Sequence, residues 1–442
     1  MKINISLKSG IFIGFLLLLI VVSYLAPERS DQVKVISTFP ATVCPAIGND
    51  VSSIAGVASP KIGRRLIDGT SKKLAAGRTS QIPLPKSSIL VEGNRSTAIT
   101  FANKNWKAVV PCSVSNGQQW FVGGSAALTS KSVLFIVNSG FSDSNVTVDL
   151  YTPTGPVEAK NFLIPQNSTK KISLDTLAPG VDEIVVGVVT KSGRVSSFLF
   201  DERKKGLKSL GADFVTSSAE LSKQVRISSI PGLVSSLVGN GNSVNHFLRL
   251  FVPGKIDANI EVTINSNDGN FVPDGLADLK LESQKVLTIP LKSAPDGQPF
   301  SLEIGSDQPI LASIFSNFTF GRSSEITWST SSNPLSSWSA NLTGSKPILS
   351  FTGKKIDVLI KASGVNGKKI EKSIKKNDFA SWQSPVGLNK VEVIAKSQGV
   401  SGGVILLPLT GKIGISSIPM NNGSNLETAS EPISDASVVT RR

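Results

Sequence analysis

The chain has 442 residues, of which 40% are hydrophobic and 18% are charged, and its formal net charge is +14. This length predicts two to four domains, and the hydrophobic fraction is enough for ordinary cores. The positive charge favours anionic partners such as acidic glycans, phosphate-bearing polymers or lipid headgroups, or else it only keeps a secreted protein soluble. We exclude nucleic acid as a partner, because the chain is expected to leave the cytoplasm and lacks basic-helix or aromatic-rich RNA motifs.

Residues 10–26 form an uncharged apolar run that follows Lys2 and Lys8. Its length is near the lower limit for a membrane-spanning helix, and the positive-inside rule places the N-terminus in the cytoplasm. A cleaved signal peptide is the alternative, but the bulky Tyr24 and Leu25 occupy positions where cleavage needs small residues. We therefore favour an uncleaved anchor, which makes this a single-pass cell-membrane protein with its body outside the cytoplasm.

Short runs rich in β-branched residues, bounded by Gly, Pro, Asn or Ser, recur along the exported part and predict strands. Examples are Val133–Val137, Val146–Tyr151, Glu183–Val189 and Lys355–Ile360. No amphipathic helix longer than two turns is evident, so we predict an all-β fold.

One pattern of strands occurs more than once in the sequence. Leu134–Gly140 followed by Asn145–Gly155 matches Leu250–Gly254 followed by Asn259–Gly269, and a weaker copy begins at Ile348. The size of the copies predicts tandem immunoglobulin-like β-sandwich repeats after one N-terminal transmembrane helix, with a β-propeller-like assembly as the alternative.

The predicted organisation has six parts. They are a cytoplasmic tip and transmembrane anchor (1–26), a stalk (27–34), a first β-sandwich region with an N-terminal extension and a disulfide (35–222), a second β-sandwich repeat (223–335), a third (336–419) and a disordered tail (420–442).

The two cysteines of the chain are Cys44 and Cys112. Outside the cytoplasm such a pair is most simply a disulfide. A catalytic thiol is the alternative, but it needs a basic partner, and the single histidine, His246, is far away in the sequence. We predict a Cys44–Cys112 disulfide.

Patterns for catalysis are scarce. His246 lies at the start of a predicted strand, and we interpret it as a surface or edge residue rather than the base of a triad. One histidine and two cysteines are too few for a zinc site, and no phosphate-binding Gly-Lys-Ser/Thr loop is present. The carboxylate pairs Asp201 with Glu202 and Asp274 with Asp278 lie beside turns and read as turn formers and solvated residues. We therefore predict no catalytic residue, metal or cofactor, and an exported carbohydrate-active enzyme is the least favoured alternative.

Trp328 and Trp338 lie in stretches rich in Ser, Thr and Asn, so they are the best candidates for exposed rings that stack on sugars. Core packing is the alternative, because Trp is mostly buried in proteins.

Two lysine clusters are candidates for anion binding. Lys204 and Lys205 lie at a predicted hairpin tip, whereas Lys368 and Lys369 begin a lysine-rich segment. The second cluster equally fits an edge strand that its charges protect against aggregation.

Several motifs carry a family resemblance. They are Ala41–Pro45, Gln119–Gly124, Val146–Val157, Leu177–Gly180, Gly211–Val215, Ile230–Gly232 and Ile326–Trp328. On these residues, most of the exported part resembles an actinobacterial family of membrane-anchored exported proteins classed as a domain of unknown function. The resemblance implies a short anchor, a β-rich exterior and work on envelope polysaccharide beside a membrane glycosyltransferase. It brings no established activity and no catalytic residues.

We therefore expect a non-catalytic, membrane-anchored extracytoplasmic protein that serves as a scaffold or accessory factor in cell-envelope glycan assembly. A membrane glycosyltransferase is the expected partner. The alternative is a module that binds anionic wall polysaccharide through the lysine clusters and Trp rings.

Overall fold

The computed structural model describes part of the chain. The described residues are 36–38, 41–48, 51–56, 63–74, 81–83, 86–92, 98–233, 242–295, 297–342, 345–364, 367–409, 414–421 and 426–428. They belong to two compact units, which we describe separately. The predicted anchor and stalk, and most of the predicted tail, lie outside the described residues. Within those residues, no helix has the length and apolar character needed to cross a membrane.

The smaller unit contains one antiparallel pair of strands, β1 (Ile36–Thr38) and β31 (Leu426–Thr428). The larger unit, Phe39–Asn425, is built from antiparallel strands, and the one helix in its described part is the short 3-10 helix η1 (Leu174–Thr176). The prediction of an all-β protein is confirmed.

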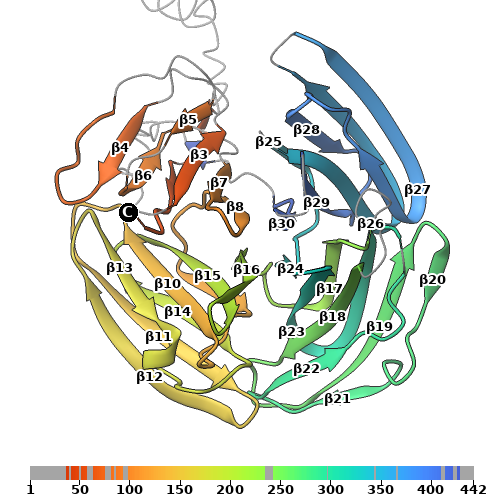
Figure 1. The fold of residues 1–442 in the computed structure, drawn as a ribbon, viewed down its shortest axis with the longest axis horizontal. Helices are drawn as coiled ribbons and strands as arrows, with labels where there is room; N and C mark the ends of the chain where they lie inside the picture. The colour runs from red at the N-terminus through yellow and green to blue at the C-terminus, as the bar shows by residue number, and fades with distance from the viewer. Residues whose placement is uncertain are drawn as a thin grey trace, which may run out of the picture. The chain divides into compact units, whose positions relative to one another are not determined.

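The strands of the larger unit fall into four successive groups, which we call repeats 1 to 4 (Figure 1). Repeat 1 contains β2 (Thr42–Cys44), β3 (Ser52–Gly56), β4 (Arg64–Ile67), β5 (Gln81–Pro83), β6 (Ser88–Val91), β7 (Ala98–Ala102) and β8 (Lys107–Pro111). Repeat 2 contains β9 (Gln118–Val122), β10 (Ser130–Asn138), β11 (Ser144–Thr152), β12 (Gly155–Ile164), β13 (Ser168–Ser173), β14 (Val185–Ser192), β15 (Val195–Lys205) and β16 (Lys208–Val215). Repeat 3 contains β17 (Ser222–Ile230), β18 (Asn242–Phe251), β19 (Ala258–Ser266), β20 (Gly269–Phe271), β21 (Leu279–Leu281), β22 (Val286–Pro290), β23 (Phe300–Phe320) and β24 (Ser323–Thr330). Repeat 4 contains β25 (Ser337–Asn341), β26 (Ser345–Ser363), β27 (Lys369–Gln383), β28 (Lys390–Ala395), β29 (Ser401–Pro408) and β30 (Ser416–Pro419).

All four repeats place their strands in the same order. If the strands of repeat 2 are numbered 1 to 8 from β9 to β16, one sheet has the order 5-2-7-8 and the other has the order 4-3-6-1. In repeat 3 the long β23 supplies positions 6 and 7, and in repeat 4 the long β26 and β27 supply positions 2 to 5. Repeat 1 has the sheets β5-β3-β7-β8 and β4-β6-β2, with no strand at position 4 in its described residues.

This order differs from the predicted immunoglobulin order. It keeps the pairings of strand 2 with strand 5 and of strand 3 with strand 6. However, strand 1 pairs with strand 6, and strand 7 pairs with strand 2, whereas an immunoglobulin sandwich pairs strand 1 with strand 2 and strand 7 with strand 6. A propeller blade would be a single four-stranded sheet, whereas each repeat here has two sheets. The region 35–222, predicted as one sandwich with an extension, contains repeats 1 and 2.

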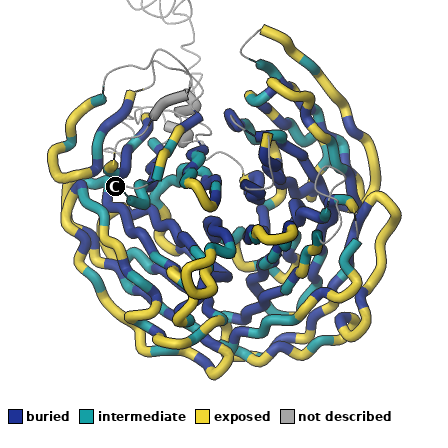
Figure 2. The backbone as a smooth tube through the Cα atoms, viewed as in Figure 1, coloured by how far each residue is buried: buried dark blue, intermediate teal, exposed yellow. Residues whose placement is uncertain are grey.

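The two sheets of a repeat enclose an apolar core, and their outer faces pack on neighbouring repeats. Along β10, Leu134 and Ile136 point into the core of repeat 2. The alternate residues Phe135 and Val137 belong to the core that repeat 1 supplies. A strand that is covered on both faces has a continuously apolar sequence, which explains the sequence of β10. Figure 2 shows the same continuous burial along inner strands, whereas buried and exposed residues alternate along the outlying strands.

The repeats pack head to tail. Repeat 2 contacts repeat 3 through an apolar cluster that includes Val185 and Phe251, and repeat 3 contacts repeat 4 through one that includes Phe318 and Ile405. Repeat 4 in turn packs on repeat 1, because Ala98 of repeat 1 belongs to the core of repeat 4. The strands at position 8 (β8, β16, β24 and β30) contact one another in the same cyclic order. Within the larger unit, the head-to-tail interface therefore closes on itself.

The predicted disulfide is confirmed, with Cys44 Sγ and Cys112 Sγ 2.01 Å apart. It joins β2, the first strand of repeat 1, to the residue that follows β8, the last strand. Val43 and Ser113 beside it exchange two backbone hydrogen bonds of 2.7 and 2.9 Å. Repeat 1 has the shortest strands of the four, so a covalent link adds stability where the core is smallest.

Candidate functional site

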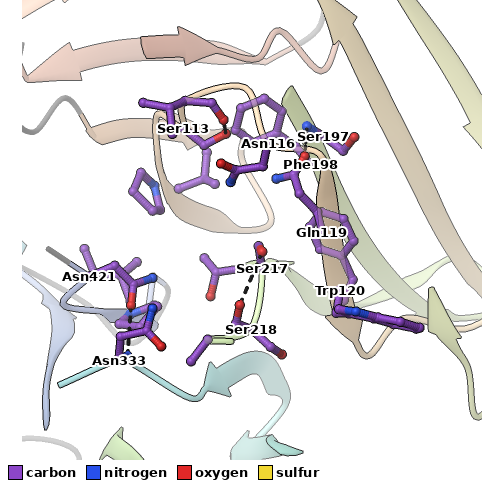
Figure 3. A pocket seen from close by; sticks show the side chains of 18 of the residues that line it. Ser113, Asn116, Gln119, Trp120, Ser197, Phe198, Ser217, Ser218, Asn333 and Asn421 are labelled. Carbon is purple, nitrogen blue, oxygen red and sulfur yellow. Dashed lines mark hydrogen bonds between the residues drawn. The ribbon is translucent and has the colours of Figure 1, made fainter. Parts of the chain in front are cut away.

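A cavity of about 590 Å³ lies where the repeats are joined (Figure 3). It is lined by the connection after β8 (112–117), the connection after β16 (216–221), Asn333 in the connection after β24, and Pro419 and Asn421 at the end of β30. Because strands at position 8 lie together, the segments that leave them meet, although they are far apart in the sequence. The volume is within the range of small-molecule sites.

The described lining of this cavity is polar but nearly uncharged. Glu220 is its one ionisable side chain, although the chain has 46 Lys and Arg residues. The amides are Asn116, Gln118, Gln119, Asn333 and Asn421, and the hydroxyls are Thr42, Ser113, Ser197, Thr216, Ser217 and Ser218. Such a lining donates and accepts hydrogen bonds to a neutral ligand but offers an anion no cationic group.

Gln119 is the most constrained of these amides. It is 3% exposed, and its Oε1 accepts a 2.8 Å hydrogen bond from the Ser197 backbone N–H. This bond fixes the orientation of the amide, and Nε2 is left without a partner among the described residues. Figure 3 shows the side chain beside Asn116 and Ser197 at the cavity. A buried amide without a partner costs about 1–3 kcal/mol, but this nitrogen is closed to solvent and so does not reach the cavity space.

Three hydroxyls of the lining share this property. The buried oxygens Thr42 Oγ1, Ser197 Oγ and Ser218 Oγ have no hydrogen-bond partner within the described part of the chain. They come from repeats 1 and 2 and from the connection to repeat 3, and like Gln119 Nε2 they are closed to solvent.

Two Trp residues of the lining differ in orientation. The ring of Trp120 turns away from the cavity in Figure 3 and packs 5.8 Å from Phe251 between centroids. Trp338 in β25 is partly buried, packs against the core of repeat 4 and lines the cavity. Of the two Trp residues predicted as ligand contacts, only Trp338 lies at this cavity.

The prediction that Trp328 is exposed is wrong, because the ring is 0% exposed. Its Nε1 donates a 3.0 Å hydrogen bond to Asp201 Oδ2. The polar neighbours that suggested exposure are buried as well: Thr327 Oγ1 donates to Asp213 Oδ2 at 2.6 Å, and Ser329 Oγ donates to the Ser229 carbonyl at 2.8 Å. Hydroxyls that find partners inside the protein do not indicate a surface.

Asp201 is also fully buried, so its interpretation as a solvated turn residue is wrong. Besides the Trp328 N–H, its carboxylate accepts hydrogen bonds from Ser132 Oγ at 2.6 Å and from Arg203 Nε at 2.9 Å. Glu202 instead accepts from Trp106 Nε1 at 3.3 Å. By contrast, Asp274 and Asp278 are exposed, as expected.

Arg249 in β18 links repeat 3 to repeat 2. Its Nη1 donates to the carbonyls of Gly124 at 3.0 Å and Ile184 at 3.1 Å, and its guanidinium lies 5.1 Å from the centroid of the Trp328 ring. Burial lowers the pKa of Arg249 to about 10. The guanidinium is engaged in this interface and is not available to a ligand.

Two buried carboxyl groups lie among the strands at position 8. Asp213 in β16 accepts hydrogen bonds from Thr327 in β24 and, at 3.2 Å, from Ser416 Oγ in β30. Burial raises the pKa of Asp213 to about 7. Glu325 accepts from the Gly414 N–H at 2.9 Å, and burial, with Asp213 nearby, raises its pKa well above the usual value. These groups join repeats 2, 3 and 4.

His246 is buried and not at a surface or edge, contrary to the prediction. It is 3% exposed, and its Nδ1 lies 2.8 Å from Ser316 Oγ while Nε2 has no partner among the described residues. Its ring meets Phe300 edge-on, with centroids 5.1 Å apart. Burial lowers the pKa of His246 to about 4, so the ring is neutral at physiological pH.

The predicted lysine clusters lie on exposed hairpins. Lys204 and Lys205 end β15 at its turn to β16, where Lys204 forms a 3.3 Å ion pair with Glu202. Lys368 and Lys369 lie at the turn between β26 and β27, and β27 pairs only with β26, as an edge strand does. None of the four lysines belongs to the described lining of the cavity.

The sequence interpretation missed the cavity. A signal was available, since the connections 112–117, 216–221 and 331–336 have equal length and each contains at least two Ser. Each of these connections follows the last strand of a repeat, but this regularity is seen only after repeat 1 has been recognised.

Comparison with known proteins gives a family but no activity. The family model described as "Family of unknown function (DUF5719)" matches residues 107–375. No curated protein matches the sequence. The solved structure of Thermotoga maritima 1070 is similar at 14% identity over 26% of this chain and 95% of that one, with a TM-score of 0.21. A tetra-tandem repeat from the extending region of a large adhesion protein is similar at 8% identity over 87% of this chain and 100% of that one, with a TM-score of 0.11.

Proposed function

We propose a function on the premise that this chain belongs to DUF5719, a family of unknown function. The chain is a non-catalytic scaffold or accessory factor in cell-envelope glycan assembly. It is anchored in the cell membrane by residues 10–26, with the N-terminus in the cytoplasm and the body outside, as in an actinobacterial exported protein. Its partner is a membrane glycosyltransferase, and its β-sandwich repeats serve as modules in tandem.

The observation that carries this proposal is the closed set of four repeats. Each repeat buries sheet faces on two neighbours, so the exposed hairpins are held at fixed positions relative to one another within the larger unit. A scaffold needs such fixed spacing between binding surfaces, because each surface that is already positioned lowers the entropy cost of binding.

The disulfide supports a location outside the cytoplasm. Disulfides such as Cys44–Cys112 persist in oxidising compartments and are rare in the cytosol. The chemistry of the cavity supports binding rather than glycoside hydrolysis, because its described lining has one carboxyl group, Glu220, whereas hydrolysis ordinarily uses two.

A capture experiment tests the proposal. The full chain, tagged at its C-terminus, is purified from gently solubilised membranes of the native host, and the proteins that accompany it are identified by mass spectrometry. We expect enrichment of a membrane glycosyltransferase over a matched control that carries residues 1–34 fused to an unrelated exported domain. Equal recovery of the enzyme with the control, or fractionation of the chain away from membranes, contradicts the proposal.

A second candidate function is binding of anionic wall polysaccharide, favoured by the exposed positions of Lys204, Lys205, Lys368 and Lys369. Retention on purified wall polymer should then fall as salt rises, because exposed charges are screened. Replacing the four lysines with glutamine should remove the retention. Salt-independent retention by that variant rejects this function.

A further inference from the structure

We propose that the inter-repeat cavity is a binding site for a neutral sugar unit of a glycan. This inference deepens the proposed function and rests on it for the source of the sugar, but the cavity itself is argued from its own geometry and chemistry.

Charge decides the class of ligand first. The chain carries a formal charge of +14, yet the described lining contains no Lys or Arg and a single carboxylate, Glu220. An anionic ligand would lose its water here without gaining a cation, which is costly. The lining therefore disfavours an anionic ligand, and a ligand of this cavity differs in charge from one that the lysine hairpins would bind.

Accessible polar groups decide the second property. Asn421 Oδ1 accepts from the Asn333 N–H at 3.3 Å, and Asn333 Oδ1 accepts from the Glu220 N–H at 3.2 Å, so both amides are held by their oxygens and keep their NH2 groups for a ligand. Gln118 is exposed at the same cavity, and Ser217 is partly exposed there. A hydroxyl group both donates and accepts, so a ligand that carries several of them satisfies this mixture of groups, whereas a hydrocarbon does not.

An apolar wall completes the site. Trp338 and Phe198 line the same cavity as the amides. A pyranose ring has an apolar C–H face and a polar rim, so an indole on one side and amides on the other match its two surfaces. Most small-molecule sites combine apolar walls with a few fixed polar groups in this way. A peptide would also find hydrogen bonds here, but it offers fewer hydroxyls to these amides and to Ser217.

The test uses the full chain in detergent and isothermal titration with four neutral tetrasaccharides, built from glucose, galactose, mannose and N-acetylglucosamine. We expect at least one of them to bind with a dissociation constant below the millimolar range. The variant Asn421→Asp keeps the acceptor for the Asn333 N–H and removes both N–H donors of the side chain, so affinity should fall at least ten-fold. Trp338→Ala should weaken binding to a similar degree.

Gln224→Glu is the matched control, because Gln224 is exposed on β17 and does not line the cavity. It should bind as the unchanged chain does. Thermal unfolding of each variant separates loss of binding from loss of fold. Absence of binding by all four sugars, full binding by both cavity variants, or binding of Ser- and Pro-rich peptides in place of the sugars overturns the proposal. The capture experiment can fail while sugar binding persists, and the reverse, so the two proposals are distinguished.

Discussion

At the scale of single residues, burial sets the behaviour of the one histidine. The folded protein keeps His246 neutral down to its pKa of about 4, whereas in the unfolded chain the ring gains a proton near pH 6.5. Its contribution to the free energy of unfolding is therefore complete above pH 6.5 and is lost as the pH falls to 4. We expect the loss to be about 3 kcal/mol.

Urea unfolding between pH 7 and 4 measures this loss, and His246→Asn should reduce the pH dependence. Because the chain has one histidine, its imidazole resonance in a tag-free protein also reports the pKa directly. A resonance that titrates near pH 6.5 in the folded protein contradicts the prediction.

Asp213 should act in the opposite direction. Its pKa is raised to about 7, so the folded protein holds a proton that the unfolded chain releases near pH 4. The stability that this group confers is complete below pH 4 and is lost as the pH rises through 7. Asp213→Asn should flatten the fall in the free energy of unfolding between pH 4 and 8 by about 4 kcal/mol. An unchanged slope in the variant would show that Glu325 or another group carries the effect.

At the scale of elements, the disulfide is expected to matter most in repeat 1. Cys44 and Cys112 are separated by 68 positions, for which loop closure gives about 4 kcal/mol. Cys112→Ser should lower the free energy of unfolding by that amount, measured by urea unfolding. Hydrogen exchange should rise first in β2 and β8. Adding reductant to the unchanged chain is the control, and a smaller effect of reductant than of the substitution points to packing of the residue rather than to the bond.

The elements that could be predicted from sequence are those whose residues alternate or run in β-branched stretches. The repeated segments begin at Leu134, Leu250 and Ile348. These residues occupy the same strand position in repeats 2, 3 and 4. Repeat 1 was not recognised because its strands are only three to five residues long, too short for a pattern to emerge. Trp328 was misplaced because its Ser and Thr neighbours form hydrogen bonds inside the protein, which no local pattern reveals.

At the scale of the whole larger unit, closure depends on close contact between repeats 4 and 1. Gly56 in β3 lies against the Asn341 carbonyl of β25, and a Cβ atom at Gly56 would clash with it. Gly56→Val should therefore lower the free energy of unfolding by about 2 kcal/mol and increase proteolysis within repeat 1. Gly305→Val is the control, because nothing lies within 4 Å of a Cβ built there. Equal effects at the two positions would refute a specific role for this contact.

No local property of the sequence predicts closure. The cavity exists because three connections and the end of β30 meet, and none of these segments is distinctive by itself. Continuous apolar runs, such as those of β10 and β29, are a local sign that both faces of a sheet are covered, but they do not say by which segment.

Thr42, before the first disulfide cysteine, and Asn421, after the last strand of repeat 4, line the same cavity. The two ends of the array therefore lie at one cavity, so circular permutation can connect the strands in a new order. A gene that starts in the exposed turn between β15 and β16 (206–207), with a linker that joins 421 to 42 and the proposed anchor placed at the new N-terminus, should encode the same arrangement of strands, because exposed connections tolerate new termini. Such a permutant would move the proposed anchor without altering the lining of the cavity, and so would test whether the position of that anchor matters.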